Sequence, residues 1–202
     1  MARPKVHDER LAEVLLEQSA VIVAKGGPDA LSLRKLTDAV GTSTSAVYSL
    51  YGSREALLLA VYERALASFE RSAQELPVTD RPMSDLFRMG REYRRWALSN
   101  PQLYPVMFMG PAGSGPEQRR ALAMPTIDRL IAALRRCIEA GELRDAESIE
   151  VMACQLWATV HGHVSLELMG LLTPEVTGRS SEEIDRSFDD LLNRSVATWR
   201  VS

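Results

Sequence analysis

The stretch LSLRKLTDAVGTSTSAVYSLYGSREALLLAVYERAL, residues 31–66, decides the fold of this chain. Leucines and valines recur in it at helical spacing, and a Ser or a Gly stands wherever one helix would end and the next would begin. The pattern predicts two short helices, a tight turn between them, and a longer third helix. Two short helices joined by a turn of three or four residues that contains Gly form a helix-turn-helix unit.

Small residues place the ends of these helices. Ser32 is expected to cap the first helix and Ser43 the second, because a Ser side chain can accept a hydrogen bond from an unpaired N–H of the first helical turn. Gly41 supplies the backbone freedom that the turn between them needs. Gly52 ends the second helix, and Ser53 is expected to cap the third.

The rest of the chain predicts helices only, since no segment alternates apolar and polar residues as a strand would. We therefore expect an all-α fold of about nine helices. Its parts are an N-terminal three-helix domain over residues 1–53, a connecting helix over about 54–75, and a C-terminal helical bundle over 76–202.

Two proline positions affect the middle of the chain. Asn100 is expected to cap a helix with Pro101 at its first position, where the missing N–H costs nothing. Pro105 is then expected to kink or shorten that helix. The run GPAGSGP, residues 110–116, predicts a loop.

The last two predicted helices carry the largest apolar surfaces. The helix at 146–172 is apolar around so much of its circumference that it must be covered from two sides. The helix at 181–200 has a narrower apolar face. Paired across a two-fold axis, the two would form a four-helix bundle between protomers of a homodimer. The alternative is that both helices only close the core of a monomer.

Charge and composition exclude several classes of protein. The net charge is −3, and the first 60 residues carry as many acidic as basic side chains, so a nucleoid packer is excluded and DNA affinity must come from the placement of a few cations. Cys137 and Cys154 lie in apolar helical patterns and are expected to be buried free thiols. No segment predicts a signal peptide or a membrane span, so we expect a cytoplasmic protein without a membrane partner.

Residues 31–66 resemble the N-terminal signature of the TetR family of regulators. The shared elements are the leucine-rich LSLRKLTDAVG, the Ser at the turn, AVYxxY in the second helix, and GSREALL at the start of the third. NPQLYPVMF and WATVHGHVSLEL resemble a subgroup with a Trp-x-x-x-His-Gly element. The resemblance implies a transcriptional regulator, by default a repressor, that binds a palindromic DNA operator as a dimer and is released by a small-molecule effector.

The resemblance also implies which residues meet DNA. The second helix would enter the major groove and present hydroxyl groups and one aromatic ring, while cations and helix starts would bind phosphates. Leu50 departs from the family pattern, and no Arg, Asn or Gln lies on this face. Direct base readout is therefore expected to be modest, and DNA shape is expected to contribute more than usual. The predicted DNA-binding residues are Ser32, Arg34, Ser43, Thr44, Ser45, Tyr48, Ser49, Arg54, Arg3 and Lys5.

A concentration of aromatic and Met residues predicts the effector site. Deformable Met side chains and flat rings suit an apolar cavity for an apolar or aromatic ligand, although at helical spacing such residues more often form a core. The predicted ligand-binding residues are Met89, Tyr93, Trp96, Tyr104, Met107, Phe108, Met124, Trp157 and His161.

Two other functions remain open at this point. A helical enzyme could use His161, His163 and Glu167, but the chain has no nucleophile–base pattern, and two His at i and i+2 on a helix point apart and cannot share a metal. We therefore expect no catalytic residue, metal or cofactor, and a surface contact between His163 and Glu167. The second alternative is a helical ligand-binding or scaffolding protein with weak or lost DNA binding.

Overall fold

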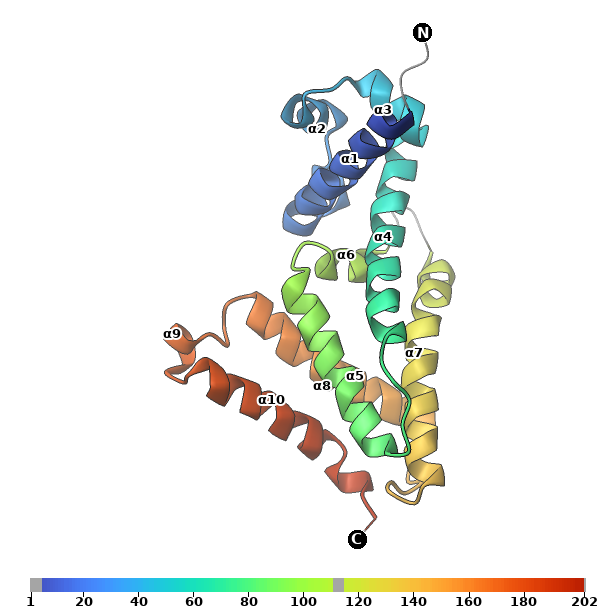
Figure 1. The fold of residues 1–202 in the computed structure, drawn as a ribbon, viewed down its shortest axis with the longest axis vertical. Coiled ribbons are helices and arrows are strands. Elements are labelled where there is room, and N and C mark those ends of the chain that lie inside the picture. Colours follow the sequence, from blue (N-terminus) through green and yellow to red (C-terminus); the bar gives the residue numbers. More distant parts are fainter. Residues whose placement is uncertain (1–4, 111–114, 202) are drawn as a thin grey trace. The chain divides into compact units, whose positions relative to one another are not determined.

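The computed structural model describes residues 5–110 and 115–201, which are helical almost throughout (Figure 1). No β-strand occurs within these two ranges, where an isolated bridge joins Leu143 and Arg200. The predicted all-α fold is confirmed. The chain divides into two compact units, one made of Met1–Phe69 and Asn100–Arg120, the other of Glu70–Ser99 and Ala121–Ser202.

The described ranges contain ten α-helices and two short 3₁₀ segments. One helix more than expected is present, because the pattern did not predict the four-residue helix α9. In chain order the elements are α1 (Lys5–Gly26), η1 (Pro28–Ala30), α2 (Leu33–Val40), α3 (Thr44–Tyr51), α4 (Arg54–Gln74), α5 (Pro82–Ser99), α6 (Tyr104–Met109), α7 (Pro116–Glu139), α8 (Ile149–Leu168), α9 (Pro174–Thr177), α10 (Ser181–Ser195) and η2 (Ala197–Trp199).

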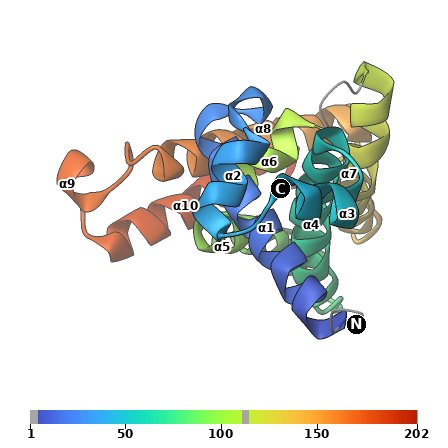
Figure 2. The same cartoon turned by 90° about the horizontal axis from the view of Figure 1, so that it is seen from above.

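The first unit is built around α1. Both α2 and α3 lie against it (Figure 2), and α6 packs on it as well. Leu15, Leu36, Val47 and Leu57 come from four different helices and are completely buried. Full burial of an aliphatic side chain contributes about 1.5–3 kcal/mol. Apolar contacts therefore hold together helices that are too short to be stable alone.

The second unit is a bundle in which α5, α8 and α10 pack on one another. One face of α8 is buried along its length, through residues such as Met152, Leu156 and Val164. The end of the chain closes this unit, because the buried Trp199 donates its indole N–H to Glu147 Oε1 at 3.2 Å.

The helix expected to begin at Pro101 begins instead at Tyr104, after a three-residue turn. Pro105 consequently lies in the first turn of α6, where its missing N–H and fixed φ are tolerated. Of the two effects expected of Pro105, a kink or a shorter helix, the structure shows the shorter helix, which has 6 residues. Most of the predicted loop at 110–116 lies outside the described residues.

Two predicted helices end earlier than expected. α8 ends at Leu168 rather than 172, and Gly170 follows in a left-handed conformation with φ 74° that a helix cannot contain. α10 ends at Ser195 rather than 200.

Cys137 is fully buried, and burial raises the pKa of its thiol to about 11. The prediction for Cys154 was wrong, because this residue is exposed.

Asp85 organises the start of α5. Its carboxylate accepts hydrogen bonds from the N–H and the hydroxyl of Thr79, each at 2.8 Å, and from Arg88 and Arg136 at 2.9 and 3.0 Å. Burial alone would raise the pKa of this carboxyl group, but the four donors outweigh it and lower the pKa to about 2. Asp85 thereby fastens the segment between α4 and α5 to α7.

Replacing Asp85 should weaken the fold in a pH-dependent way. We expect Asp85→Asn to lower the free energy of unfolding at pH 7 by about 2 kcal/mol, because donors are left without their charged acceptor. Since the folded pKa lies below the ordinary value of 3.8, the wild-type advantage should disappear as the pH falls from 3.8 through about 2. Urea unfolding followed by circular dichroism between pH 7 and 2 measures both effects.

The matched control is Asp80→Asn, because Asp80 is an exposed carboxylate of the same segment. Its replacement should change the stability by less than about 0.5 kcal/mol. Equal effects of the two substitutions would contradict the assigned role of Asp85.

Candidate nucleic-acid interface

The local geometry of α2 and α3 follows the caps that the sequence predicts. Ser32 Oγ accepts from Lys35 N–H at 3.4 Å, and Ser43 Oγ accepts from Ala46 N–H at 3.2 Å. Gly41 between the helices is left-handed, with φ 73°, and its N–H bonds to the carbonyl of Thr37. A residue with a Cβ would be strained there. The predicted helix-turn-helix is therefore present with its turn and caps.

The two sides of α3 have different surroundings. Val47 is completely buried, and Tyr51 donates its hydroxyl to the Ala12 carbonyl of α1 at 2.7 Å. Tyr48, about 100° further around the helix than Val47, is 54% exposed. The three hydroxyl residues predicted to face DNA, Thr44, Ser45 and Ser49, are also exposed. One helix therefore anchors the domain with one face and presents a polar, aromatic surface with the other.

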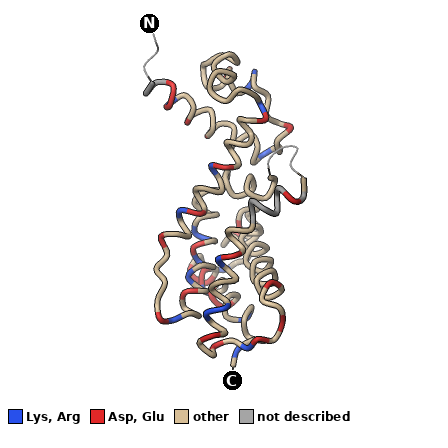
Figure 3. Tube along the Cα trace, turned by 90° about the vertical axis from the view of Figure 1, so that its right-hand side faces the viewer, with Lys and Arg blue, Asp and Glu red and all other residues tan. Residues whose placement is uncertain are grey.

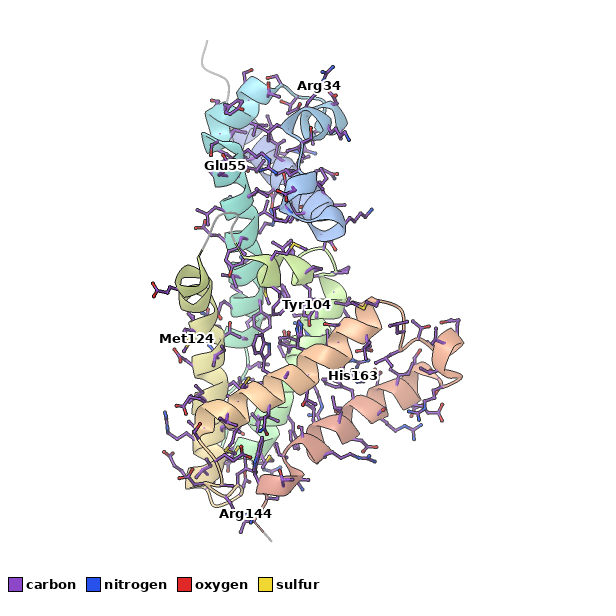
Figure 4. The ribbon with its side chains drawn as sticks, turned by 180° about the vertical axis from the view of Figure 1, so that it is seen from behind. Arg34, Glu55, Tyr104, Met124, Arg144 and His163 are labelled. Atoms are coloured by element: carbon purple, nitrogen blue, oxygen red, sulfur yellow. The ribbon has the colours of Figure 1, made fainter. Side chains whose placement is uncertain are left out.

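The predicted phosphate contacts differ in how they are placed. Arg34 is exposed and projects away from the start of α2 (Figure 4), beside the exposed Lys35. Arg54 instead directs its guanidinium at backbone carbonyls of Pro28 and Leu31. Arg3 lies outside the described residues, and Lys5 is described only as the first residue of α1.

Hydrogen bonding within the turn shapes the polar face. Ser43 Oγ lies 2.8 Å from Ser45 Oγ, so these two hydroxyls share a hydrogen bond in addition to the cap. Charged residues of both signs occur in the N-terminal part of the chain, and neither sign forms a long continuous block along the trace (Figure 3). The interface is therefore a small hydroxyl-rich surface with a few cations beside it, rather than a broad basic patch.

Some of the predicted ligand-binding residues come together in the second unit. Tyr93 of α5 is buried, and its hydroxyl lies 3.1 Å from His161 Nδ1 of α8. His161 Nε2 lies 3.5 Å from Ser165 Oγ, and the ring of Trp157 lies 6.0 Å from the imidazole. Burial lowers the pKa of His161, so its ring is neutral at pH 7. The result is a neutral polar chain among aromatic rings.

The remaining residues of that prediction are placed separately. Tyr104 and Phe108 belong to the first unit and pack edge to face at 5.1 Å, with Met107 beside them in α6. In the second unit Trp96 is buried, and Met89 packs against the apolar core. Met124 of α7 is partly buried.

Family models match most of the chain. The model described as Tetracyclin repressor-like, C-terminal domain, matches residues 86–194, which is more than half of the sequence. The model described as Bacterial regulatory proteins, tetR family, matches residues 15–61, which include α2 and α3. The chain belongs to the TetR family. It is a DNA-binding transcriptional regulator with a helix-turn-helix, as the resemblance of residues 31–66 implied.

Individual proteins agree with membership of the TetR family. An HTH-type transcriptional regulator of Mycobacterium bovis is 28% identical over 174 residues, covering 71% of this chain and 74% of the relative. A solved TetR family regulator from Thermus thermophilus has a TM-score of 0.70 at 24% identity, covering 89% of this chain and 97% of that one. A TetR family regulator from Marinobacter aquaeolei has a TM-score of 0.72 at 19% identity, covering 94% and 97%. The two structures share the fold.

This TetR-family chain also holds a charged cluster that the sequence analysis missed. Arg94 of α5 makes two hydrogen bonds of 2.6 Å with Glu167 of α8 and an ion pair of 2.7 Å with Asp185 of α10. Its guanidinium also lies 5.1 Å above the ring of Phe188. The hydrogen bonds to Glu167 raise the pKa of Arg94 further above its ordinary value.

The expected surface contact between His163 and Glu167 was wrong, because both side chains are largely buried. His163, labelled in Figure 4, comes from α8. Its Nε2 lies 3.6 Å from Glu167 Oε2, and its ring lies 5.1 Å from the ring of Phe188. Burial lowers the pKa of His163. A signal existed in the sequence: beyond its first turn, α8 has only one ionisable carboxylate, Glu167. Such a carboxylate in an apolar helix needs a cationic partner from another helix.

Proposed function

We propose that this TetR-family protein is a repressor that binds a palindromic operator as a homodimer and is released by a small apolar or aromatic effector. The observation that supports it most directly is the division of α3 into a buried face with Val47 and an exposed face with Tyr48. A helix held in this way can enter the major groove without disturbing the domain that carries it. No helix of the described residues is long and apolar enough to span a bilayer. We infer that the protein works in the cytoplasm, without catalysis.

The exposed side chains define how the operator would be read. Thr44, Ser45 and Ser49 offer hydroxyls that can donate to or accept from several bases, and Tyr48 offers a ring for a thymine methyl group or a hydroxyl for a phosphate. Ser43 contributes through its cap, which places the first turn of α3. Arg34, together with the N-terminus of α2 that Ser32 caps, would hold a phosphate. Such contacts position the protein on the duplex more than they distinguish one base pair from another, so DNA shape supplies much of the specificity.

Selection from a pool of random duplexes should return a palindromic sequence for the wild-type protein. On that duplex we expect Tyr48→Ala and Arg34→Ala each to weaken binding by tenfold or more, since each removes an exposed group of the reading surface. Anisotropy titrations at fixed salt measure the dissociation constants.

Lys25→Ala is the matched control, because Lys25 is an exposed cation near the end of α1. It should bind the selected duplex as wild type does. Failure to select any duplex would favour the alternative of a helical ligand-binding protein without DNA binding. Unchanged affinity of both variants would show that another surface reads DNA.

An exposed apolar stripe on α8 supports the dimer. It consists of residues at intervals of three or four that fall on the side opposite the buried face: Val151, Cys154, Ala158, Gly162, Leu166 and Met169. Val151 and Leu166 are 43% and 42% exposed, and a Cβ on Gly162 would meet nothing within 4 Å. Small residues in the middle of the stripe allow a second helix to approach closely. The exposed Cys154 fits this stripe.

The surface of α10 carries alternating charges, which suit a contact between two copies of the chain. A hollow on it is lined by residues of both signs, among them Arg179, Glu183, Arg186, Asp190 and Arg194. In an isologous contact each such residue meets residues of the same patch on the partner, so alternating charges can pair. We infer that α8 and α10 form the dimer interface.

A charge placed in the stripe should separate the protomers. We expect Ala158→Arg to convert a dimer into a monomer, because the interface would have to bury a guanidinium without a partner. Size-exclusion chromatography with light scattering at about 10 μM measures the mass. Ala132→Arg, at an exposed alanine of α7, should leave the dimer intact. A dimeric Ala158→Arg protein would place the interface elsewhere.

The aromatic cluster of the second unit supports the effector site. Tyr93, Trp157 and His161 offer ring surfaces together with a neutral donor–acceptor chain that ends at Ser165. We infer that an uncharged aromatic molecule binds beside them and reaches this chain with its polar group. Binding would release the operator by favouring a dimer whose two reading helices no longer match the half-sites.

A thermal-shift screen of phenols and aromatic alcohols tests this site. A compound that binds should raise the melting temperature of the wild-type protein by mass action and weaken its binding to the operator. His161→Leu should reduce that temperature shift, whereas Thr159→Ala, on the opposite side of α8, should retain it. A hit that stabilises His161→Leu as much as wild type would exclude His161 from the site.

A further inference from the structure

Arg54 is the first residue of α4, and its side chain is turned back onto the chain that leads into α2. Its Nε donates to the carbonyl of Leu31 at 2.9 Å, and one Nη donates to the carbonyl of Pro28 at 2.6 Å. The side chain is only 29% exposed, and its remaining ionic contact is a 3.9 Å approach to Glu55. The guanidinium is therefore hydrogen-bonded within the helix-turn-helix domain, unlike that of the exposed Arg34.

The Leu31 carbonyl needs such a partner, whereas the Pro28 carbonyl also accepts from the Leu31 N–H at 3.2 Å. Leu31 is buried and has an extended backbone that cannot continue the 3₁₀ turn of η1, so its carbonyl lies outside any helix. A buried carbonyl without a donor is costly. Two donors of one planar guanidinium can reach two carbonyls at once, which the single point charge of a Lys cannot reproduce.

These hydrogen bonds link the start of α2 to the start of α4, which follows the end of α3. Leu31 directly precedes Ser32, the cap of α2, and Arg54 directly follows the short link that ends α3. Three residues earlier, Tyr51 is bonded to α1. The end of α3 is thus bonded to α1, and the start of α4 is bonded to the segment from which α2 begins.

We propose that Arg54 is a positioning residue that fixes α2 and α3, the two helices of the helix-turn-helix, to α4, rather than a phosphate contact. The part of this proposal that concerns DNA affinity rests on the proposed function, whereas the internal connection does not. Any movement of the first turn of α4 is carried to the start of α2 through two short hydrogen bonds. Arg54 therefore determines how rigidly α3 is presented.

Arg54→Lys and Arg54→Gln, compared with Arg34→Gln, test the proposal in the full-length protein. Hydrogen exchange of the free protein should rise at residues 28–36 in both Arg54 variants and remain at the wild-type level in Arg34→Gln. On the selected duplex both Arg54 variants should bind about tenfold more weakly, with an unchanged slope of log affinity against log salt. Arg34→Gln should instead lower that slope by about 0.9, as expected when one phosphate contact is lost.

Several outcomes overturn the proposal. Restoration of wild-type affinity and exchange by Arg54→Lys would show that charge alone suffices. A slope lowered by about 0.9 in Arg54→Gln, with unchanged exchange, would make Arg54 a phosphate contact. Faster exchange throughout α1–α4 would make it a general stability residue. If wild type bound no duplex, the proposed function would fail, while the exchange measurements would still decide whether Arg54 holds residues 28–36.

Discussion

The arrangement of the second unit depends on one largely buried guanidinium, that of Arg94, whose side chain is 16% exposed. It joins α5 to α8 through Glu167 and to α10 through Asp185, and it stacks on Phe188 of α10. An apolar interface of the same size could be as stable, because removing charges from water offsets most of their attraction. The ionic contact adds a requirement of geometry: helices that slid or rotated would leave a buried charge without a partner.

The helix geometry that the Arg94 ion pairs require also fixes the surfaces that we propose to act in regulation. Tyr93 precedes Arg94 on α5, so the helix rotation that satisfies the ion pair also places the Tyr93 hydroxyl on His161. On α8 the same rotation places Glu167 inward and the stripe around Ala158 outward. A change at the aromatic cluster is therefore expected to alter the stripe that we propose as the dimer surface. In the first unit the corresponding constraint is Val47, whose burial leaves Tyr48 exposed.

The parts of the fold that depend on neighbours in sequence could be predicted, and those that depend on distant partners could not. The caps at Ser32 and Ser43 and the turn at Gly41 involve residues three or four positions apart, so the pattern contained them. The burial of Arg94 depends on α8 and α10, more than 70 positions away. The start of α6 and the exposure of Cys154 likewise depend on tertiary packing. For Arg54 the family pattern indicated a position near DNA, but only the structure shows the carbonyls that it holds.

The balance of charge in the N-terminal residues affects how the regulator is distributed between its specific site and non-specific DNA. Non-specific affinity comes almost entirely from cations that meet phosphates, and a chromosome offers millions of competing sites. Because acidic residues balance the cations of residues 1–60, we expect weak non-specific binding and fewer copies held on unrelated sequence. We expect a small cellular population to suffice for occupying the specific site, with less time spent sliding along unrelated duplex.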